Sequence, residues 1–301
     1  MASFEITIIA ILVMIFLGYF LKRIDLLNIS DVNTLNKIVI NVTMPCLIFS
    51  ALYTADLSSI GKLAIMPLVG LIVSSFSGII AYSILTFKRY PKKEKWSIMV
   101  PIILGNTAFL GFPLTLGIFG DIGLIRAIFY DISSLIVFLS LSVILMFNFG
   151  GSFKTAIKKV LSFPVLWAVT FGIFFNLIQL SIGDLPLKVI DYLAAASIPL
   201  IMISLGLSLQ FKNIKRSLKV ATFATVIKLL IGPLIALIIV TILGLTGIEH
   251  TIAIIEAGMP SGMLTLVLAI NYDLDFKLTA DCVVITTVMS LISLPILIGL
   301  L

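Results

Sequence analysis

Residues 105–121 read GNTAFLGFPLTLGIFGD and lie within an apolar segment that is long enough to cross a membrane. Four glycines, one proline and one asparagine interrupt this segment, and such residues weaken a helix. Backbone groups without hydrogen-bond partners are tolerated at the middle of a bilayer only where they are buried in protein or line a water-filled cavity. The stretch therefore predicts a broken membrane helix whose break is shielded from lipid.

A second interrupted stretch, EAGMPSGMLTLVLAINYD at 256–273, matches the first after a shift of 150 residues. The shift places 114–131 on 264–281 without a gap, and 42–50 resembles 196–204 at a slightly different shift. These matches predict an internal repeat, with residues 1–150 and 151–301 each forming five helices. Because five is odd, the second repeat enters the membrane from the opposite side, as in the inverted repeats of secondary transporters.

The composition outside these stretches indicates the same class of protein. Of 301 residues, 60% are hydrophobic and 11% are charged, and the mean hydropathy is +1.26. A soluble protein carries about 25% charged residues. We therefore expect an all-α polytopic membrane protein with the first span at the N-terminus rather than a cleaved signal peptide. The ten predicted spans lie near 4–22, 33–54, 60–86, 98–119, 122–149, 162–181, 187–210, 217–244, 249–272 and 276–300.

Basic residues are distributed unevenly over the loops between these spans. Fifteen of the twenty Lys and Arg residues lie in or beside the odd-numbered loops. By the positive-inside rule these loops are cytoplasmic, so both termini are expected outside the cell membrane. The net charge of +6 is then a signal of topology, and we expect the lipid bilayer rather than nucleic acid as a partner. The fifteen are Lys22, Arg23, Lys88, Arg89, Lys92, Lys93, Lys95, Lys154, Lys158, Lys159, Lys212, Lys215, Arg216, Lys219 and Lys277.

The two interrupted spans, 98–119 and 249–272, are equivalent under the repeat and predict a transport site. Half-helix N-termini at such breaks present free N–H groups and partial positive charge, which suit an anion. Ordinary helix kinks at Pro113 and Pro260 are the alternative interpretation. Asn106, Thr107 and Ser261 are the polar candidates beside the breaks, and Asn41 gives the second span a similar irregularity.

Ionisable side chains inside spans need a reason, because they cost several kcal/mol in lipid. Glu256 lies at the second break and matches Asn106 under the shift, so it is a candidate proton carrier, with a structural carboxylate as the alternative. Asp131 is a candidate for the substrate site. Lys228 could neutralise Glu256 or Asp281, or accompany a substrate carboxylate. With His250 as the only histidine, and with Cys46 and Cys282 expected to pack as apolar residues, no metal site is predicted.

The chain resembles the auxin efflux carrier family. The likeness is carried by NKIVINVTMPCLIFSAL (36–52), GNTAFLGFPL (105–114), IPLIMISLGLSL (198–209) and EAGMPSGMLTLVLAINYDLD (256–275). The resemblance implies two inverted five-helix repeats whose fourth and ninth spans cross at proline breaks, with a scaffold bundle beside a mobile transport bundle. It also implies small organic anions as substrates, such as indole acetate or dicarboxylates.

The resemblance places the family's span-4 asparagine on Asn106, its crossover prolines on Pro113 and Pro260, and a polar residue near the substrate on Asp131. Glu256 departs from the family, where an amide is common. A carboxylate there would repel an anion unless it were protonated or paired, which favours coupling to H⁺ or Na⁺. We expect no other cofactor, and we leave a homodimer open as an alternative to a monomer.

Two other functions compete with a carrier. An intramembrane aspartyl protease could use Asp131 and Asp281 as a carboxyl pair, but the TADC context of Asp281 differs from the motif of presenilin-like enzymes. A passive channel is the other alternative. Since no nucleotide-binding loop is present in the sequence, we predict a secondary active transporter that is not an enzyme.

Overall fold

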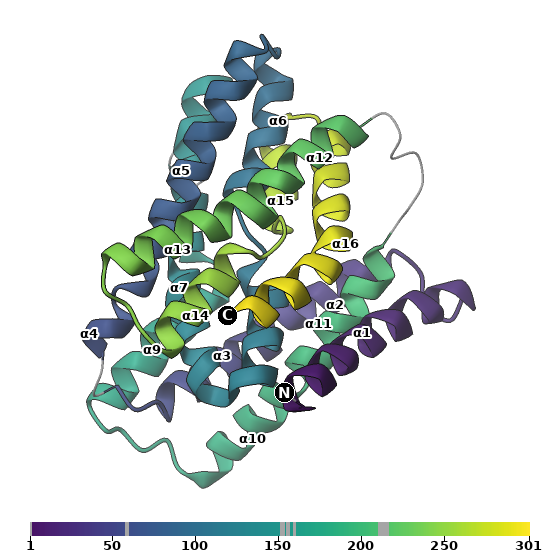
Figure 1. The fold of residues 1–301 in the computed structure, drawn as a ribbon. Helices are drawn as coiled ribbons and strands as arrows, with labels where there is room; N and C mark the ends of the chain where they lie inside the picture. Colours follow the sequence, from purple (N-terminus) through teal and green to yellow (C-terminus); the bar gives the residue numbers. More distant parts are fainter. Residues whose placement is uncertain (1, 58–59, 151–153, 155–156, 159–160, 210–216) are drawn as a thin grey trace. The chain divides into compact units, whose positions relative to one another are not determined.

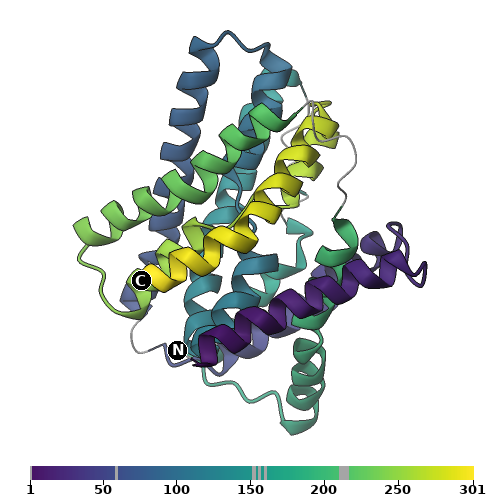
Figure 2. The ribbon, with the colours of Figure 1, turned by 45° about the vertical axis from the view of Figure 1, so that its right-hand side comes forward.

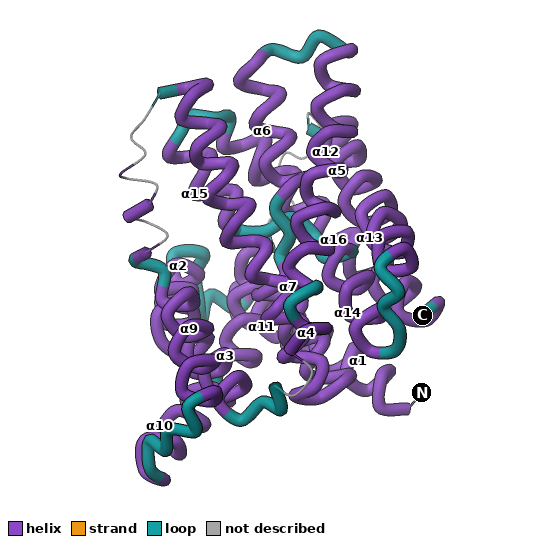
Figure 3. Tube along the Cα trace, turned by 90° about the vertical axis from the view of Figure 1, so that its left-hand side faces the viewer, coloured by secondary structure: helices purple, strands orange, loops and turns teal. Residues whose placement is uncertain are grey.

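The structure is a computed structural model that describes residues 2–57, 60–150, 154, 157–158, 161–209 and 217–301. Within these ranges all regular structure is helical, apart from one isolated β-bridge (Figure 3). The expected all-α class is thus confirmed. The basic residues Lys159, Lys212, Lys215 and Arg216 of the predicted cytoplasmic loops lie outside the described residues.

In the part of the chain that the structure describes, seven helical stretches are at least 18 residues long and apolar enough to cross a membrane. Ten crossings and the inverted repeat stay predictions. The predicted sixth span, 162–181, contains a shorter helix, Pro164–Leu177, because the chain turns at Gln179 with a positive φ of 54°. The seven stretches are Glu5–Arg23, Asp31–Tyr53, Gly61–Phe87, Thr107–Phe149, Asp184–Ser208, Leu218–Ile242 and Phe276–Leu300.

The helices form two compact units, and each unit takes helices from both halves of the sequence (Figure 1). Unit 1 comprises residues 1–60, 113–125 and 158–210, and unit 2 comprises 61–112, 126–157 and 211–301. The division of the chain into repeats at residue 150 stays a prediction. Unit 1 contains α1 (Ala2–Arg23), α2 (Asp31–Ile38), η1 (Val39–Thr43), α3 (Met44–Tyr53), α9 (Pro164–Leu177), α10 (Asp184–Ala195) and α11 (Ser197–Ser208).

Unit 2 holds most of the remaining helices. The long helix α7 (Phe112–Phe149) contributes to both units and is kinked at Gly120, where φ is 63° and ψ is −160°. This kink separates the predicted fourth and fifth spans. A short helix, α4 (Ile60–Leu63), stands at the junction of the units in the sequence. The other elements of unit 2 are α5 (Met66–Phe87), α6 (Lys92–Ile103), η2 (Thr107–Gly111), α12 (Leu218–Val226), η4 (Ile227–Ile231), α13 (Gly232–Ile242), α14 (Ile248–Ala257), α15 (Leu264–Asn271) and α16 (Phe276–Leu300).

Three short π-helical turns, η1, η2 and η4, each end two residues before a proline. The prolines are Pro45, Pro113 and Pro233, and each lies in the first turn of the α-helix that follows. Proline has no N–H group, and its ring clashes with the carbonyl of the preceding turn. A wider π-turn accommodates this defect without ending the helix, and such turns often occur at functional sites.

In unit 1, α1 and α11 pack through glycines at very close range. A Cβ atom at Gly18 would lie 2.2 Å from the carbonyl oxygen of Ile203, and one at Gly206 would lie 2.0 Å from that of Ile15. Because rising numbers on one helix meet falling numbers on the other, the two helices are antiparallel. Lys22 Nζ donates to the carbonyls of Leu207, at 2.8 Å, and Leu209, so it also satisfies the C-terminal end of α11.

Unit 1 is also held by polar contacts of α3. The side-chain amide of Asn176, on α9, donates to the carbonyls of Leu52, Tyr53 and Ala55 at 3.1, 2.8 and 2.8 Å, which satisfies the end of α3. Ser50 Oγ donates to Asp191 Oδ1 on α10 at 2.6 Å. These bonds tie the helices from the two halves of the sequence into one bundle.

In unit 2, α5 and α6 form a hairpin (Figure 2), and α16 packs against α6 and α12. Ser97 connects α6 to the first turn of α16. Asp275 N donates to the Ser97 hydroxyl at 2.8 Å, and Thr279 Oγ1 donates to the Ser97 carbonyl at 3.0 Å. A buried ion pair joins α7 to α14: Arg126 Nε and Nη2 lie 2.9 and 2.6 Å from Glu249 Oε1. These contacts position the helices around the two interrupted segments.

Candidate functional site

The two interrupted segments of the sequence cross each other in unit 2. Helix α6 ends at Ile103, α14 ends at Ala257, and Gly105 and Ser261 form an antiparallel bridge between the extended residues that follow. Asn106 N donates to the carbonyl of Pro260 at 2.7 Å, and Gly262 N donates to that of Leu104 at 3.0 Å. Each break therefore satisfies backbone groups of the other, which explains how both persist among buried helices. We call residues 104–106 and 260–262 the crossing.

The crossing depends on a glycine at position 262. A Cβ atom there would lie 2.5 Å from the carbonyl oxygen of Gly105 and 3.0 Å from its carbonyl carbon. Both atoms belong to the backbone, so a side chain could not be accommodated by a rotamer change. Glycine is required because the two chains approach so closely.

Pro260 lies at the crossing, whereas Pro113 lies outside it, in the first turn of α7 after the π-turn η2. The helix is continuous at Pro113, because the wider π-turn accommodates the missing N–H group and the proline ring. The chain leaves helical geometry earlier, at Leu104 and Asn106, whose φ/ψ values are −93°/119° and −94°/49°.

A polar cluster follows the first break directly. Thr107, which is buried, donates its hydroxyl to Asp131 Oδ1 on α7, and its Oγ1 lies 3.1 Å from Ser134 Oγ. The structure thus brings together three of the predicted residues, because Thr107 follows Asn106 and contacts Asp131. Ser134 belongs to the same cluster and was not among the predicted site residues, although its position three residues after Asp131 places both on one helix face.

Glu256 lies in the last turn of α14, beside the second break. It is 1% exposed, and neither of its carboxylate oxygens has a hydrogen-bond partner among the described residues. A Cβ atom at Gly111 would lie 2.3 Å from Oε2 and 2.5 Å from Oε1, so the carboxyl group packs directly on the η2 backbone. Ser261 Oγ at the crossing is likewise buried without a partner. Buried polar groups of this kind are rare and need an explanation such as a ligand.

Lys228 is the cation of the site. It is 5% exposed, lies in the π-turn η4, and places Nζ 3.1 Å from the position that a Cβ atom of Gly105 would occupy. Glu256 interacts electrostatically with Lys228 and with Asp131, but it has no hydrogen bond to either. One cation and two carboxyl groups are therefore gathered around the crossing.

Two predicted polar residues lie elsewhere. Asn41 belongs to unit 1, is exposed, and donates its amide to the carbonyl of Lys37 in its own helix at 2.8 Å. Asp281, on α16, accepts a hydrogen bond from Ser217 Oγ. Since Asp131 is bonded to Thr107 instead, the two aspartates have different partners.

Sequence reasoning missed the partly buried ion pair between Arg126 and Glu249. Arg126 was one of few basic residues beside an even-numbered loop, and Glu249 opens the predicted ninth span. Opposite charges at the ends of two apolar spans were the available signal, but the sequence does not tell which spans are neighbours.

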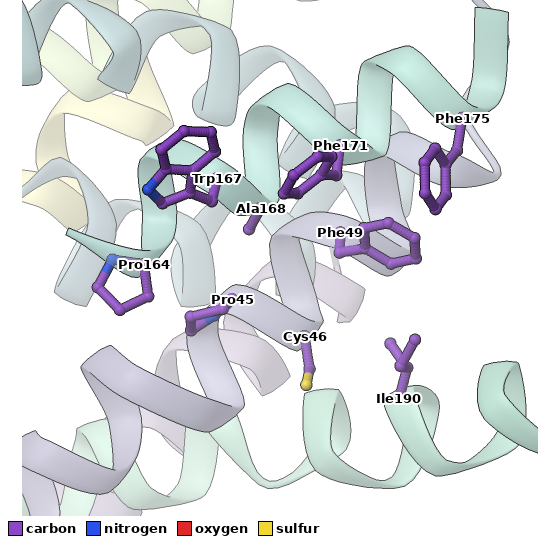
Figure 4. Close-up of a pocket in the computed structure, with 9 residues that line it drawn as sticks. All are labelled: Pro45, Cys46, Phe49, Pro164, Trp167, Ala168, Phe171, Phe175 and Ile190. Atoms are coloured by element: carbon purple, nitrogen blue, oxygen red, sulfur yellow. The ribbon is translucent and has the colours of Figure 1, made fainter. Parts of the chain in front are cut away.

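A separate apolar pocket of about 400 Å³ lies in unit 1, between α3, α9 and α10 (Figure 4). Its wall is dominated by aromatic rings, with Trp167 stacked on Phe171 at a centroid distance of 5.7 Å. No charged side chain lines it, so this pocket offers nothing to hold an anion. The lining residues are Pro45, Cys46, Phe49, Pro164, Trp167, Ala168, Phe171, Phe175 and Ile190.

Comparison with known proteins identifies the family of the chain. The family model described as membrane transport protein matches residues 4–298. The chain belongs to the membrane transport protein family. Together with the apolar helices, membership makes this transporter a multi-pass membrane protein.

Relatives of this transporter occur in archaea and plants. An uncharacterized transporter of Methanothermobacter thermautotrophicus is 42% identical over 290 residues, 96% of each chain. Another, from Methanocaldococcus jannaschii, is 34% identical over 95% of this chain and 94% of the relative. The probable auxin efflux carrier component 9 of rice is 29% identical over 148 residues, which are 47% of this chain and 34% of the rice protein. The resemblance to auxin efflux carriers is thus confirmed.

Membership also decides between the competing classes of function. The protein is a transporter and not an enzyme, which contradicts the alternative of an aspartyl protease using Asp131 and Asp281. The separate hydrogen-bond partners of these two aspartates give the physical reason, because a catalytic pair would share a proton between adjacent carboxyl groups.

Proposed function

We propose that this transporter is a secondary carrier that moves small organic anions, such as mono- or dicarboxylates or auxin-like compounds, by alternating access around the crossing. The observation that carries the proposal is the buried, unpartnered Glu256 beside a crossing that also holds Lys228. Buried charged groups without hydrogen-bond partners destabilise a static core, whereas a site that binds and releases a charged ligand needs them.

The choice of an anion follows from the charges that face the crossing. Lys228 supplies a buried ammonium group, and α15 and the η2–α7 helix both begin just after the breaks. Helix N-termini present N–H groups and partial positive charge, which stabilise a carboxylate. Asn106, which is buried, adds a side-chain amide donor at the first break.

Coupling to an ion follows from Glu256. An ionised carboxylate buried next to an anion site would repel the substrate, so the charge of Glu256 must be cancelled when the anion binds. A proton or a sodium ion could do so, and we propose that one of them is carried with the substrate. We also propose that the carrier lies in the cell membrane with both termini outside, and the excess of basic residues in the odd-numbered loops supports this orientation.

The test is uptake of radiolabelled indole-3-acetate and succinate into proteoliposomes that contain the purified protein. We expect uptake of at least one of the two, faster with a pH or sodium gradient than without. Glu256→Gln should abolish the dependence on the gradient, whereas Asp273→Asn, an exposed carboxylate of unit 2, should behave as wild type. Uptake of neither anion would contradict the substrate class, and Glu256→Gln with unchanged gradient dependence would contradict the coupling.

A further inference from the structure

We propose that Lys228 is the group that binds the substrate carboxylate and that Glu256 is its counter-charge in the empty carrier. On binding, the substrate carboxylate replaces Glu256 as the counter-charge of Lys228, and Glu256 takes up one proton. Each substrate molecule is then carried with one proton, and a monocarboxylate crosses without net charge. The inference rests on the proposed function and specifies its binding group, its coupling ion and its stoichiometry.

The geometry around Gly105 supports the choice of Lys228. The Lys228 ammonium lies beside Gly105, and Ser261, whose buried hydroxyl has no partner, forms the β-bridge with the same residue. The ammonium comes from η4 and the hydroxyl from the extended residues of the second break, and both flank one point of the crossing. A carboxylate has two acceptor oxygens and can take one hydrogen bond from each donor, with the ammonium bond being charge-assisted.

Asp131 and Glu256 differ in their hydrogen bonds, and this difference identifies Glu256 as the group that the substrate carboxylate replaces. Asp131 already accepts a hydrogen bond from Thr107, so its charge is supported locally. In the described part of the chain Glu256 accepts none, and the positive charge that acts on it through space is that of Lys228. The other titratable groups that face Glu256 are Asp131 and Tyr130, and neither supplies a positive charge.

Charge balance then dictates the step. In this proposal Asp131 keeps its hydrogen bond to Thr107 and the same charge throughout the cycle. In the empty carrier the Lys228 ammonium and the Glu256 carboxylate sum to zero, so an incoming carboxylate would add one uncompensated negative charge to a buried site, which is costly. A proton from the aqueous phase forms an O–H bond on Glu256 and restores the balance, and on the other side of the membrane the anion and the proton leave together. Because a monocarboxylate and its proton form a neutral pair, the pH gradient drives their transport and the membrane potential does not.

The test measures proton and anion fluxes together in proteoliposomes, with internal pH reported by a trapped dye and the potential clamped by valinomycin and potassium. For wild type we expect one proton per transported anion. Indole-3-acetate should then move at a rate that does not change when the potential is reversed, whereas succinate keeps one uncompensated charge and should move at a rate that follows the potential. Glu256→Gln should retain anion exchange but lose the proton flux. A proton flux that persists in Glu256→Gln, or a rate of indole-3-acetate transport that follows the potential, would overturn the proposal.

Lys228 requires variants that separate binding from folding. Lys228→Met should raise the KM for the carried anion at least tenfold, and Lys228→Arg should recover part of the loss. The double variant Lys228→Met with Glu256→Gln leaves no unpaired charge, so it should unfold at a higher temperature than Lys228→Met yet still fail to transport. A double variant that transports with the wild-type KM would overturn the role of Lys228. Wild type that carries neither probe would instead overturn the proposed function itself.

Discussion

Replacing Gly262 by alanine should separate the two chains at the crossing. The added Cβ would lie 2.5 Å from the carbonyl oxygen of Gly105 and 3.5 Å from Asn106 N, and both contacts are to backbone. The chains must therefore move apart, which lengthens the hydrogen bonds Asn106 N to Pro260 O, now 2.7 Å, and Gly262 N to Leu104 O, now 3.0 Å.

The cost follows from these contacts. Two backbone hydrogen bonds contribute about 1 kcal/mol each to stability, and overpacking a tight site costs about 1 to 3 kcal/mol. We therefore expect Gly262→Ala to lower the free energy of unfolding of unit 2 by about 3 to 5 kcal/mol. The expected consequence for function is loss of anion uptake, since the groups around the crossing would no longer be held in place.

The assay compares thermal unfolding in detergent and uptake into proteoliposomes for wild type, Gly262→Ala and a matched control. Gly61→Ala is the control, because a Cβ atom there meets nothing within 4 Å and the backbone needs no positive φ. Gly61→Ala should match wild type in both measurements. Equal unfolding temperatures and uptake rates for the Gly262 and Gly61 variants would show that the crossing does not require glycine at position 262.

Two further predictions concern the contacts that hold each unit together. Arg126→Met should destabilise unit 2 by about 3 to 5 kcal/mol, since it leaves the buried Glu249 charge unpaired, whereas Lys93→Met removes an exposed pair and should cost less than about 1 kcal/mol in the same thermal unfolding assay. Adding Glu249→Gln to Arg126→Met should recover most of the loss, and no recovery would argue against the ion pair. In unit 1, Asn176→Ala should cost about 1 to 3 kcal/mol because three carbonyls at the end of α3 lose their donor. Asn148→Ala, which removes a bond to a single exposed carbonyl, is the control, and equal effects of the two would contradict the capping role of Asn176.

Much of the site could be predicted because its signals are local. Glycine, proline and polar residues inside apolar segments mark breaks wherever they occur, so both halves of the crossing and the neighbouring Glu256 were found from the sequence alone. Lys228 was found in the same way, as a cation inside an apolar span. Such signals depend on the free energy that a polar group costs in lipid, so they can be recognised without knowing which helices pack against each other.

What the sequence could not provide was the pairing between segments. Proline marks both a break and an ordinary first turn, and only the backbone partners at the crossing show that Pro260 is at the break and Pro113 is not. The glycines at 105 and 262 looked like helix-weakening residues, yet their role is to let two backbones and Lys228 approach one another. Contacts of this kind depend on tertiary structure, and no local pattern encodes them.

The most direct test of the central claim, that the anion binds at the crossing, is protection of a cysteine placed there. Ser261→Cys, in a chain in which Cys282 is replaced by alanine, would be treated with a small methanethiosulfonate in proteoliposomes. Cys46, half-buried in the apolar pocket of unit 1, serves as an internal control. We expect a transported carboxylate to slow modification at position 261 but not at Cys46, and we expect modification at position 261 to stop uptake. If the carboxylate does not change the rate of modification at position 261, and uptake continues afterwards, the anion does not bind at the crossing.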